Sequence, residues 1–473
     1  MLTCTPPQGQ TQEEAPCCAN CLLLRAMPSR AELARCLFPD TLLAGLSIAS
    51  PASAAPPEGS YRGHAYGTFA SSDAGPVAAT LGRSAFQPCG CRGTDGQVMQ
   101  NSIGSLSAGQ SVAPRWSGHH GIHRRAREPG CVTNTSKVER PNLFNGRIQA
   151  KRAKAVANVV ATTADIDTDA EGTGFVGLRI NGQPISDSVA PNTNVALPGI
   201  GTVIVKRVKR DGNSTFQVIT VEALVVKVEE ENNFDLPVGS EIIVGHARAG
   251  FSRTVPEVVF GGSAYAAEGN TKIGERLASK IGKAAAVYIG CEGTAGKTNT
   301  NNIEELDVEK VMAFGSGKTT AFGGNTSTGR VAKATAKVED VSLLIGAVTA
   351  DAVTAVAQET IKNGVKTRST KGSGFVGLRV NGVSMPVPTP PNTVVQLPKF
   401  GRVVLNEQKI PPAGSSDSTK VNGMVIIITK PNALNLAVGS RIVVAHAAAR
   451  VLPFDEEPLE MSQDGLSVAE AKN

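Results

Sequence analysis

The strongest constraint on the fold is that the sequence repeats itself at an offset of 200 residues. Phe175-Val-Gly-Leu-Arg179 returns as Phe375-Val-Gly-Leu-Arg379, and Cys-x-Gly-Thr occurs at both Cys91 and Cys291. Solenoid repeats run to about 20–50 residues, so a period of this length predicts a duplicated domain of ordinary size. We place copy 1 at residues 59–252 and copy 2 at residues 258–453.

Residue patterning predicts strands in both copies. Aromatic residues make up 4 % of the chain, whereas glycine and proline number 50 and 28, which favours short strands and turns over long helices. Apolar alternation and valine-rich runs predict the strands, while two Ala/Val-rich segments fit helix or strand and are interpreted as strand. The strands are expected at 154–160, 176–180, 203–208, 216–228 and 240–244, and at 347–357, 376–380, 403–405, 421–428 and 441–444. The predicted fold is all-β, with two tandem, homologous β-sandwich-like domains and flexible tails at both ends.

The N-terminal extension, residues 1–54, is typical of an export signal. Arg30 and Arg35 precede a short apolar stretch, and the sequence Ala-Ser-Ala ends at Ala54. Cleavage is therefore expected between Ala54 and Ala55. The apolar stretch is too short to span a bilayer as a helix. The protein is expected to be secreted, or to be associated with the cell surface.

Met27 is the expected true start, because the signal features begin there. The acidic tail, residues 454–473, carries no hydrophobic anchor, and no membrane span is expected. Four cysteines follow residue 54, too few for a disulfide-dense scaffold. Pairing fits an exported protein, but the sequence leaves its connectivity open. The four are Cys89, Cys91, Cys131 and Cys291.

Both copies contain Gly-x-Gly-x-x-Gly, beginning at Gly172 and at Gly372. A dinucleotide site with this spacing needs a strand before the glycines and a helix after them. Here a strand pattern and the turn Asn181-Gly182 follow instead, so we expect no bound nucleotide. Gly315-Ser-Gly-Lys-Thr-Thr320 resembles a phosphate loop, but Met312 replaces the first required glycine, and we interpret the segment as a linker.

Other recurring residues do not assemble a reaction centre. His246 and His446 occupy equivalent strand ends and are interpreted as structural histidines. Glu139 and Glu339 recur without a second recurring acid, whereas hydrolases of sugar polymers use paired carboxylates. We therefore predict no catalytic residues, no cofactor and no metal site.

Residues 114–130 differ completely from their counterpart in copy 2. They contain the single tryptophan, four arginines and three histidines. His119 and His123 could bind a metal, the arginines could contact a polyanion, or the segment is a divergent exposed loop. Two compensating reading-frame errors would also preserve the offset while changing the composition.

Several of these strings together resemble the choice-of-anchor P family. They are Gly-Phe-Val-Gly-Leu-Arg-(Ile/Val)-Asn-Gly, Pro-Asn-Thr, and Val-Gly-Ser-x-Ile-(Ile/Val)-Val-x-His-Ala, and they occur in both copies. The resemblance implies an exported, β-rich surface protein of a Gram-positive bacterium, with no catalytic residues to carry over. The chain departs from the family because it has neither a Leu-Pro-x-Thr-Gly sorting signal nor an anchor helix.

The sequence thus favours a secreted or cell-surface structural or binding protein that is not an enzyme. Its expected partner is a cell-wall or extracellular-matrix component. Net charge is only +6 and basic residues are interspersed with acidic ones, so no specific nucleic-acid partner is expected. The alternatives are an extracellular hydrolase of wall or matrix polymers and a pair of carbohydrate-binding modules. The oligomeric state stays open.

Overall fold

The computed structural model describes residues 57–71, 84, 86–93, 98–99, 122–124, 130–234, 236–273, 277–303, 305–308 and 310–456. It is 62 % strand and 1 % helix, which confirms the all-β prediction. The helical part is the 3-10 turn η2 (Phe454–Glu456). Among the described residues, no helix has the length and apolar character needed to cross a membrane. The expected signal with Ala54 and Ala55, the start at Met27, and most of 114–130 lie outside the described residues.

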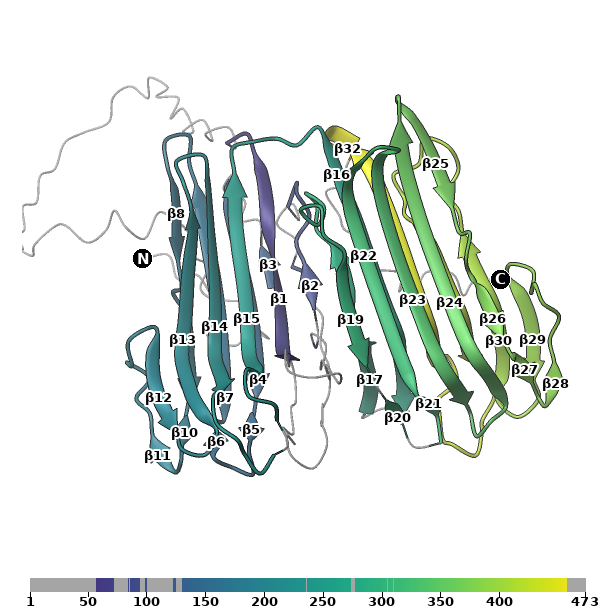
Figure 1. The fold of residues 1–473 in the computed structure, drawn as a ribbon, viewed down its shortest axis with the longest axis horizontal. Coiled ribbons are helices and arrows are strands. Elements are labelled where there is room, and N and C mark those ends of the chain that lie inside the picture. Colours follow the sequence, from purple (N-terminus) through teal and green to yellow (C-terminus); the bar gives the residue numbers. More distant parts are fainter. Residues whose placement is uncertain are drawn as a thin grey trace, which may run out of the picture.

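Copy 1 forms three antiparallel sheets, at the purple-to-teal end of Figure 1. The six-stranded sheet has the order β12 (Thr193–Leu197), β13 (Gly201–Gly212), β14 (Phe216–Val228), β15 (Glu241–Ser252), β1 (Ser60–Ser71), β2 (Gln87–Pro88). The five-stranded sheet has the order β3 (Ile122–Arg124), β4 (Cys131–Glu139), β7 (Arg152–Ala161), β8 (Ile166–Asp169), with β9 (Gly174–Val176) also paired to β7. The four-stranded sheet has the order β11 (Gln183–Pro184), β10 (Arg179–Ile180), β6 (Ile148–Gln149), β5 (Asn142–Leu143).

Copy 2 forms two larger antiparallel sheets, at the green-to-yellow end. The seven-stranded sheet has the order β17 (Leu277–Ala284), β16 (Val258–Ile273), β32 (Arg441–Pro453), β31 (Thr419–Ile428), β30 (Gly401–Lys409), β29 (Thr393–Leu397), with β18 (Val287–Ile289) also paired to β16. The main path of the ten-stranded sheet is β19 (Asn299–Ile303), β22 (Ser316–Thr326), β23 (Gly329–Leu343), β24 (Val348–Lys362), β27 (Arg379–Val380), β28 (Val383–Ser384). Beside this path lie β20 (Leu306–Val308), β21 (Met312–Phe314), β25 (Val365–Ser369) and β26 (Gly374–Val376).

Strand registers repeat between the copies with the same offset as the sequence. Glu222 lies opposite His246 in copy 1, and Asn422 lies opposite His446 in copy 2. The residue before each histidine, Gly245 or Ala445, has a left-handed φ of 70° or 56° and is skipped by the ladder. The facing residue, Ala223 or Gly423, is skipped as well, so the register is unchanged and the strand contains no extra residue. The left-handed residue changes which face the following side chains occupy, since Val244 and Ala247 both pack into the same core.

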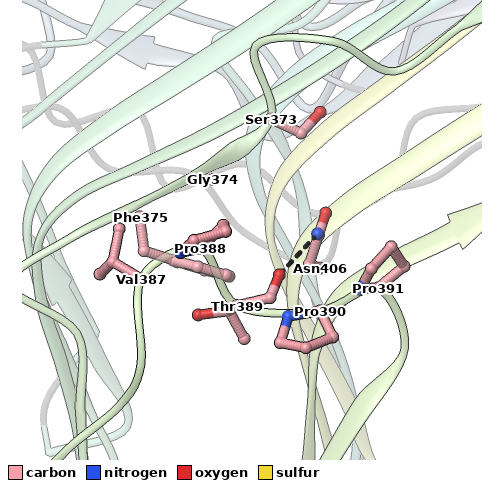
Figure 2. Close-up of a pocket in the computed structure, with 9 residues that line it drawn as sticks. All are labelled: Ser373, Gly374, Phe375, Val387, Pro388, Thr389, Pro390, Pro391 and Asn406. Atoms are coloured by element: carbon pink, nitrogen blue, oxygen red, sulfur yellow. Dashed lines mark hydrogen bonds between the residues drawn. The ribbon is translucent and has the colours of Figure 1, made fainter.

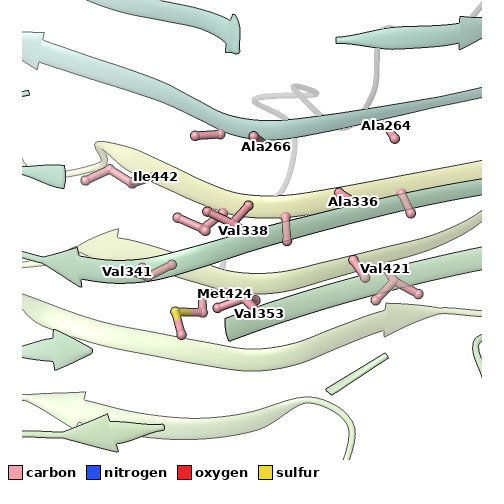
Figure 3. Close-up of a cluster of buried hydrophobic side chains, with 14 of the residues drawn as sticks. Ala264, Ala266, Ala336, Val338, Val341, Val353, Val421, Met424 and Ile442 are labelled. Atoms are coloured by element: carbon pink, nitrogen blue, oxygen red, sulfur yellow. The ribbon is translucent and has the colours of Figure 1, made fainter. Parts of the chain in front are cut away.

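Small side chains fill the space between the two sheets of copy 2. Figure 3 shows Ala336 and Val338 beside Ala266 and Ile442 of the facing sheet, and Val353 beside Met424. Alternate residues of β23 are fully buried, as a period-two pattern requires. Burying one valine side chain contributes about 1.5–3 kcal/mol, so many such contacts rather than a few aromatic ones stabilise the core.

The structure corrects the interpretation of Gly315–Thr320 as a linker. This segment enters β22, which pairs with β19 on one side and β23 on the other. A Cβ atom on Gly317 would lie 2.8 Å from the Cβ of Ala266, so glycine permits close packing of the two sheets. The predicted strand at 176–180 is interrupted at Gly177, whose φ is 63°, whereas the strand predicted at 216–228 is confirmed as β14.

Copy 2 buries a carboxylate where copy 1 has an apolar side chain. Glu359 on β24 is 0 % exposed and accepts bonds from the Thr419 amide (3.1 Å), the Thr419 hydroxyl (2.9 Å) and the Val451 amide (3.1 Å). The Arg368 Nε lies 3.2 Å and the Lys366 Nζ 3.7 Å from its oxygens. Burial lowers the pKa of Lys366. The equivalent positions of copy 1 are Val159, Ile166, Thr168, Ile219 and Phe251.

We expect Glu359→Val alone to destabilise the protein by about 3–5 kcal/mol, because it leaves buried donors and cations without their anion. Replacing the cluster together by the copy 1 residues (Glu359→Val, Lys366→Ile, Arg368→Thr, Thr419→Ile) should recover most of this loss. Urea unfolding of both variants measures the difference. A combined variant less stable than Glu359→Val would contradict the view that copy 1 shows an equivalent apolar solution.

Candidate functional site

A group of charged side chains crosses three strands of the six-stranded sheet. Arg207 on β13 donates two bonds of 2.8 Å to the carboxylate of Glu241 on β15, and its Nε donates to Glu222 on β14. The His246 Nδ1 lies 3.1 Å from the other Glu222 oxygen. The side chains of Arg207, Glu222 and His246 are all buried.

The environment of Glu222 keeps its carboxylate ionised. Burial opposes ionisation, but hydrogen bonds from His246 and Arg207 outweigh that effect and lower the pKa of Glu222 to about 2. Burial opposes the charge of Arg207 as well, but the carboxylates of Glu241 and Glu222 outweigh it and raise the pKa of Arg207. The Glu222 and Glu241 carboxylates thus flank the Arg207 guanidinium, and the imidazole ring of His246 lies on the Glu222 side.

Aromatic rings lie against the histidine. Tyr66 on β1 stacks on His246 with ring centroids 4.1 Å apart, and His64 stacks on it at 5.0 Å. A histidine oriented by a carboxylate is part of many hydrolytic sites, where it activates a nearby hydroxyl or thiol. The bidentate Arg207–Glu241 pair instead ties β13 to β15 across β14, which is a structural arrangement.

Copy 2 retains the site with its charges exchanged. Glu407 replaces Arg207 and Arg441 replaces Glu241, and the Arg441 Nη2 lies 2.9 Å from Glu407 Oε2. Asn422 replaces Glu222, and its amide oxygen lies 2.6 Å from the His446 Nδ1. An ion pair between the outer strands is thus kept while its direction is reversed. This reversal favours a structural role, since a catalytic histidine requires its carboxylate in a fixed place.

A shallow pocket of about 380 Å³ opens at the end of copy 2 (Figure 2). Phe375, Val387 and Pro388 form its apolar side, and the Asn406 amide donates to the Thr389 carbonyl at 3.2 Å. Copy 1 has Lys206 in place of Asn406, and its ammonium donates to the Asp187 carbonyl. Apolar walls with few polar groups suit a small apolar group rather than a charged substrate.

The other recurring residues of the sequence analysis do not lie together in the structure. Glu139 pairs with Lys137 and Arg152 on the five-stranded sheet, and these cations outweigh burial and lower its pKa. Glu339 pairs with Lys337, which lowers its pKa. No group of three or more metal-binding side chains occurs among the described residues.

The placement of His246 and His446 at strand ends was wrong. Both lie within long strands, β15 and β32, directly after the left-handed residue. The error arose because the left-handed residue interrupts the apolar alternation, which resembles the end of a strand in the sequence. The glycines of Gly-x-Gly-x-x-Gly lead into β9 and β10, as expected, with no helix following them.

Sequence reasoning missed Arg207, Glu222 and Glu241. The sequence did contain one signal. Each of these charged residues interrupts an apolar strand, and the equivalent position of copy 2 carries a different charged or polar residue. A search restricted to identical residues in the two copies passes over such exchanged pairs.

Comparison with known proteins identifies no relative. No protein-family model matches the chain. No curated protein and no solved structure matches it either.

We expect the charge cluster to make stability depend on acid pH. The folded pKa of Glu222, about 2, lies below its ordinary value of 4.5, so its contribution is present above pH 4.5 and is lost as pH falls toward 2. The shift corresponds to about 3 kcal/mol. Urea unfolding should therefore show that Glu222→Asn costs about this much at pH 7 and little at pH 2.

Asn422 provides the matched control for that measurement, because its side chain does not titrate. Asn422→Ala should change the free energy of unfolding by a similar amount at both pH values. An equally large cost of Glu222→Asn at pH 2 and pH 7 would contradict the assigned ionisation.

Proposed function

We propose that the protein is a secreted or cell-surface protein with a structural or binding role and no catalytic activity. One observation supports this most strongly: a disulfide joins Cys91 to Cys291, the equivalent cysteines of the two copies. Disulfides form and persist in oxidising compartments and are rare in the cytosol. The bond therefore agrees with an exported protein whose two copies work as a linked pair.

The surroundings of the disulfide also favour a fixed junction. Val259 and Leu452 pack against it. The rings of Phe86 and Tyr288, one from each copy, stack with centroids 3.9 Å apart. A junction held by a covalent bond and buried contacts suits a protein that bears load or presents two surfaces at a set separation.

The proposed partner is a component of the cell wall or extracellular matrix. This follows the expectation of export and the resemblance to exported surface proteins, together with the apolar pocket at the end of copy 2. Specific nucleic-acid and nucleotide binding are not part of the proposal.

Fractionation of native cells tests the location directly. We expect the protein in the medium or wall, beginning at Ala55, with Cys91 and Cys291 resistant to alkylation until a reductant is added. A cytoplasmic protein that begins at Met1 or Met27 and is alkylated at both cysteines without reduction contradicts the proposal.

Removing the disulfide should destabilise the native pair of copies. The bond closes a loop with a sequence separation of 200. In the chain-entropy description a loop of this size stabilises by about 5 kcal/mol, and measured losses are typically about 2–5 kcal/mol. Cys91→Ser with Cys291→Ser, followed by urea unfolding, should show a loss in this range, and reduction of the wild-type protein should reproduce it. An unchanged unfolding curve would mean that the bond does not contribute.

A further inference from the structure

Two equivalent strands form open sheet edges on opposite sides of the molecule. β8 is the last strand of the five-stranded sheet of copy 1 and pairs with β7. β25 lies at the edge of the ten-stranded sheet of copy 2 and pairs with β24. Each strand lies on the side of its copy that faces away from the other copy (Figure 1). Within the described part of the chain, neither strand has a partner strand on its outer side.

The hairpin register shows which main-chain groups of β8 lie at the open edge. The Thr162 amide donates to the Asp165 carbonyl at 2.8 Å, so Asp165 and every second residue after it direct their main-chain groups toward β7. Those of Ile166 and Thr168 point away from the sheet. The Ile166 amide is bonded to the Asp165 carboxylate at 2.8 Å. The Thr168 amide and the carbonyls of Ile166 and Thr168 therefore remain for another strand.

The edge of β25 has the same main-chain pattern. The two turn residues, Asn363 and Gly364, have left-handed φ values of 51° and 75°, and Lys362 pairs with Val365 across the turn. The main-chain groups of Val365 therefore face β24. Those of the residues between the inward-facing positions, Lys366 and Arg368, point away from the sheet. Both copies thus present an open row of main-chain donors and acceptors.

The two edges carry opposite charge. Residues 162–171 of copy 1 contain four acidic side chains and no basic one, whereas residues 362–371 of copy 2 contain four basic side chains and no acidic one. The sign is reversed directly at Glu171, whose equivalent is Lys371. The acidic residues are Asp165, Asp167, Asp169 and Glu171, and the basic ones are Lys362, Lys366, Arg368 and Lys371.

The contrast persists when only exposed charges are counted. Lys366 and Arg368 lie beside the buried Glu359 carboxylate, which balances part of their charge. Lys362 and Lys371 are exposed, one on each side of β25. On copy 1, the exposed side chains of the same stretch are all acidic among its charged residues. They are Asp165, Asp167 and Glu171.

Opposite signs permit one kind of edge contact and oppose the other two. Charged side chains on an edge strand commonly prevent pairing with another molecule. Charges of the same sign on both edges would oppose every such contact. With opposite signs, β8 repels β8 of another molecule and β25 repels β25, whereas β8 attracts β25. The charge pattern therefore selects a second copy of this chain, in one orientation, as the partner of each edge.

We propose that molecules of this protein assemble end to end, with the β8 edge of one molecule paired to the β25 edge of the next. A head-to-tail contact that does not close into a ring produces an open filament. The Cys91–Cys291 disulfide links the two copies, so each molecule carries both edges on one cross-linked body. The inference rests on the proposed structural role for its biological meaning. Assembly of the purified protein can nevertheless fail while fractionation still finds the protein outside the cell, so the two failures are distinguishable.

Sedimentation velocity of the oxidised full chain tests the proposal. At low ionic strength the weight-average mass should rise with protein concentration beyond that of a dimer, and added salt should return it toward the monomer because the edge charges are screened. Asp165→Lys with Asp167→Lys and Glu171→Lys makes both edges basic, and Lys362→Glu with Lys371→Glu makes both exposed edges acidic. Each variant alone should stay monomeric. An equimolar mixture of the two should assemble again, since edges of opposite sign are then present.

A further variant separates strand pairing from general attraction between charges. Thr168→Pro removes the outward amide of β8 and leaves every charge in place, and proline is tolerated on edge strands. Assembly should be lost, whereas the control Thr168→Ser should assemble like the original chain. Thermal unfolding checks that each variant keeps the monomer fold.

Three results would overturn the proposal. The first is a chain that stays monomeric at low ionic strength. The second is assembly that persists in the charge variants taken singly or in Thr168→Pro. The third is a mass that stops rising at the dimer, because a closed dimer pairs like surfaces rather than β8 with β25.

Discussion

Close packing of short side chains between facing sheets is the constraint on which the rest of the structure depends. Alanine and valine leave little space between strands, and at Gly317 even a Cβ atom would approach Ala266 to 2.8 Å. A core of this kind has no room for large polar groups without exact partners. Charged side chains are therefore found on the outer faces and edges, or are buried only where several donors meet one acceptor, as at Glu359.

The duplication shows which features this packing requires and which it tolerates. The left-handed residue before His246 and His446 is kept in both copies, because it sets the face on which the following residues lie. The charges beside it are exchanged, from Arg207 and Glu241 to Glu407 and Arg441. An ion pair links the two outer strands in both copies, β13 to β15 and β30 to β32. It does so whichever of the two strands carries the arginine.

The all-β class and most long strands followed from alternation and turn residues alone, as β14 illustrates. Three things did not follow. The strand β22 was hidden because Gly315–Thr320 lacks apolar alternation and owes its conformation to neighbours distant in sequence. The pairing of Cys91 with Cys291 depends on how the two copies meet, which no local pattern encodes. The charge clusters required comparison of unlike residues at equivalent positions.

Differences between the two copies carry more functional information than their similarities. Shared residues such as Phe175 and Phe375 are buried and maintain the common fold. At the exposed ends the copies diverge in a consistent direction, toward polar side chains at Gln183, Asp187 and Asn194 and toward valine at their counterparts. Exposed valine adds little to folding stability, and copy 1 keeps the same strand pairing with Gln183 and Asn194 in place of Val383 and Val394. Because the pairing does not require valine there, these positions mark a difference in surface chemistry between the two copies, which the Cys91–Cys291 bond holds in one molecule.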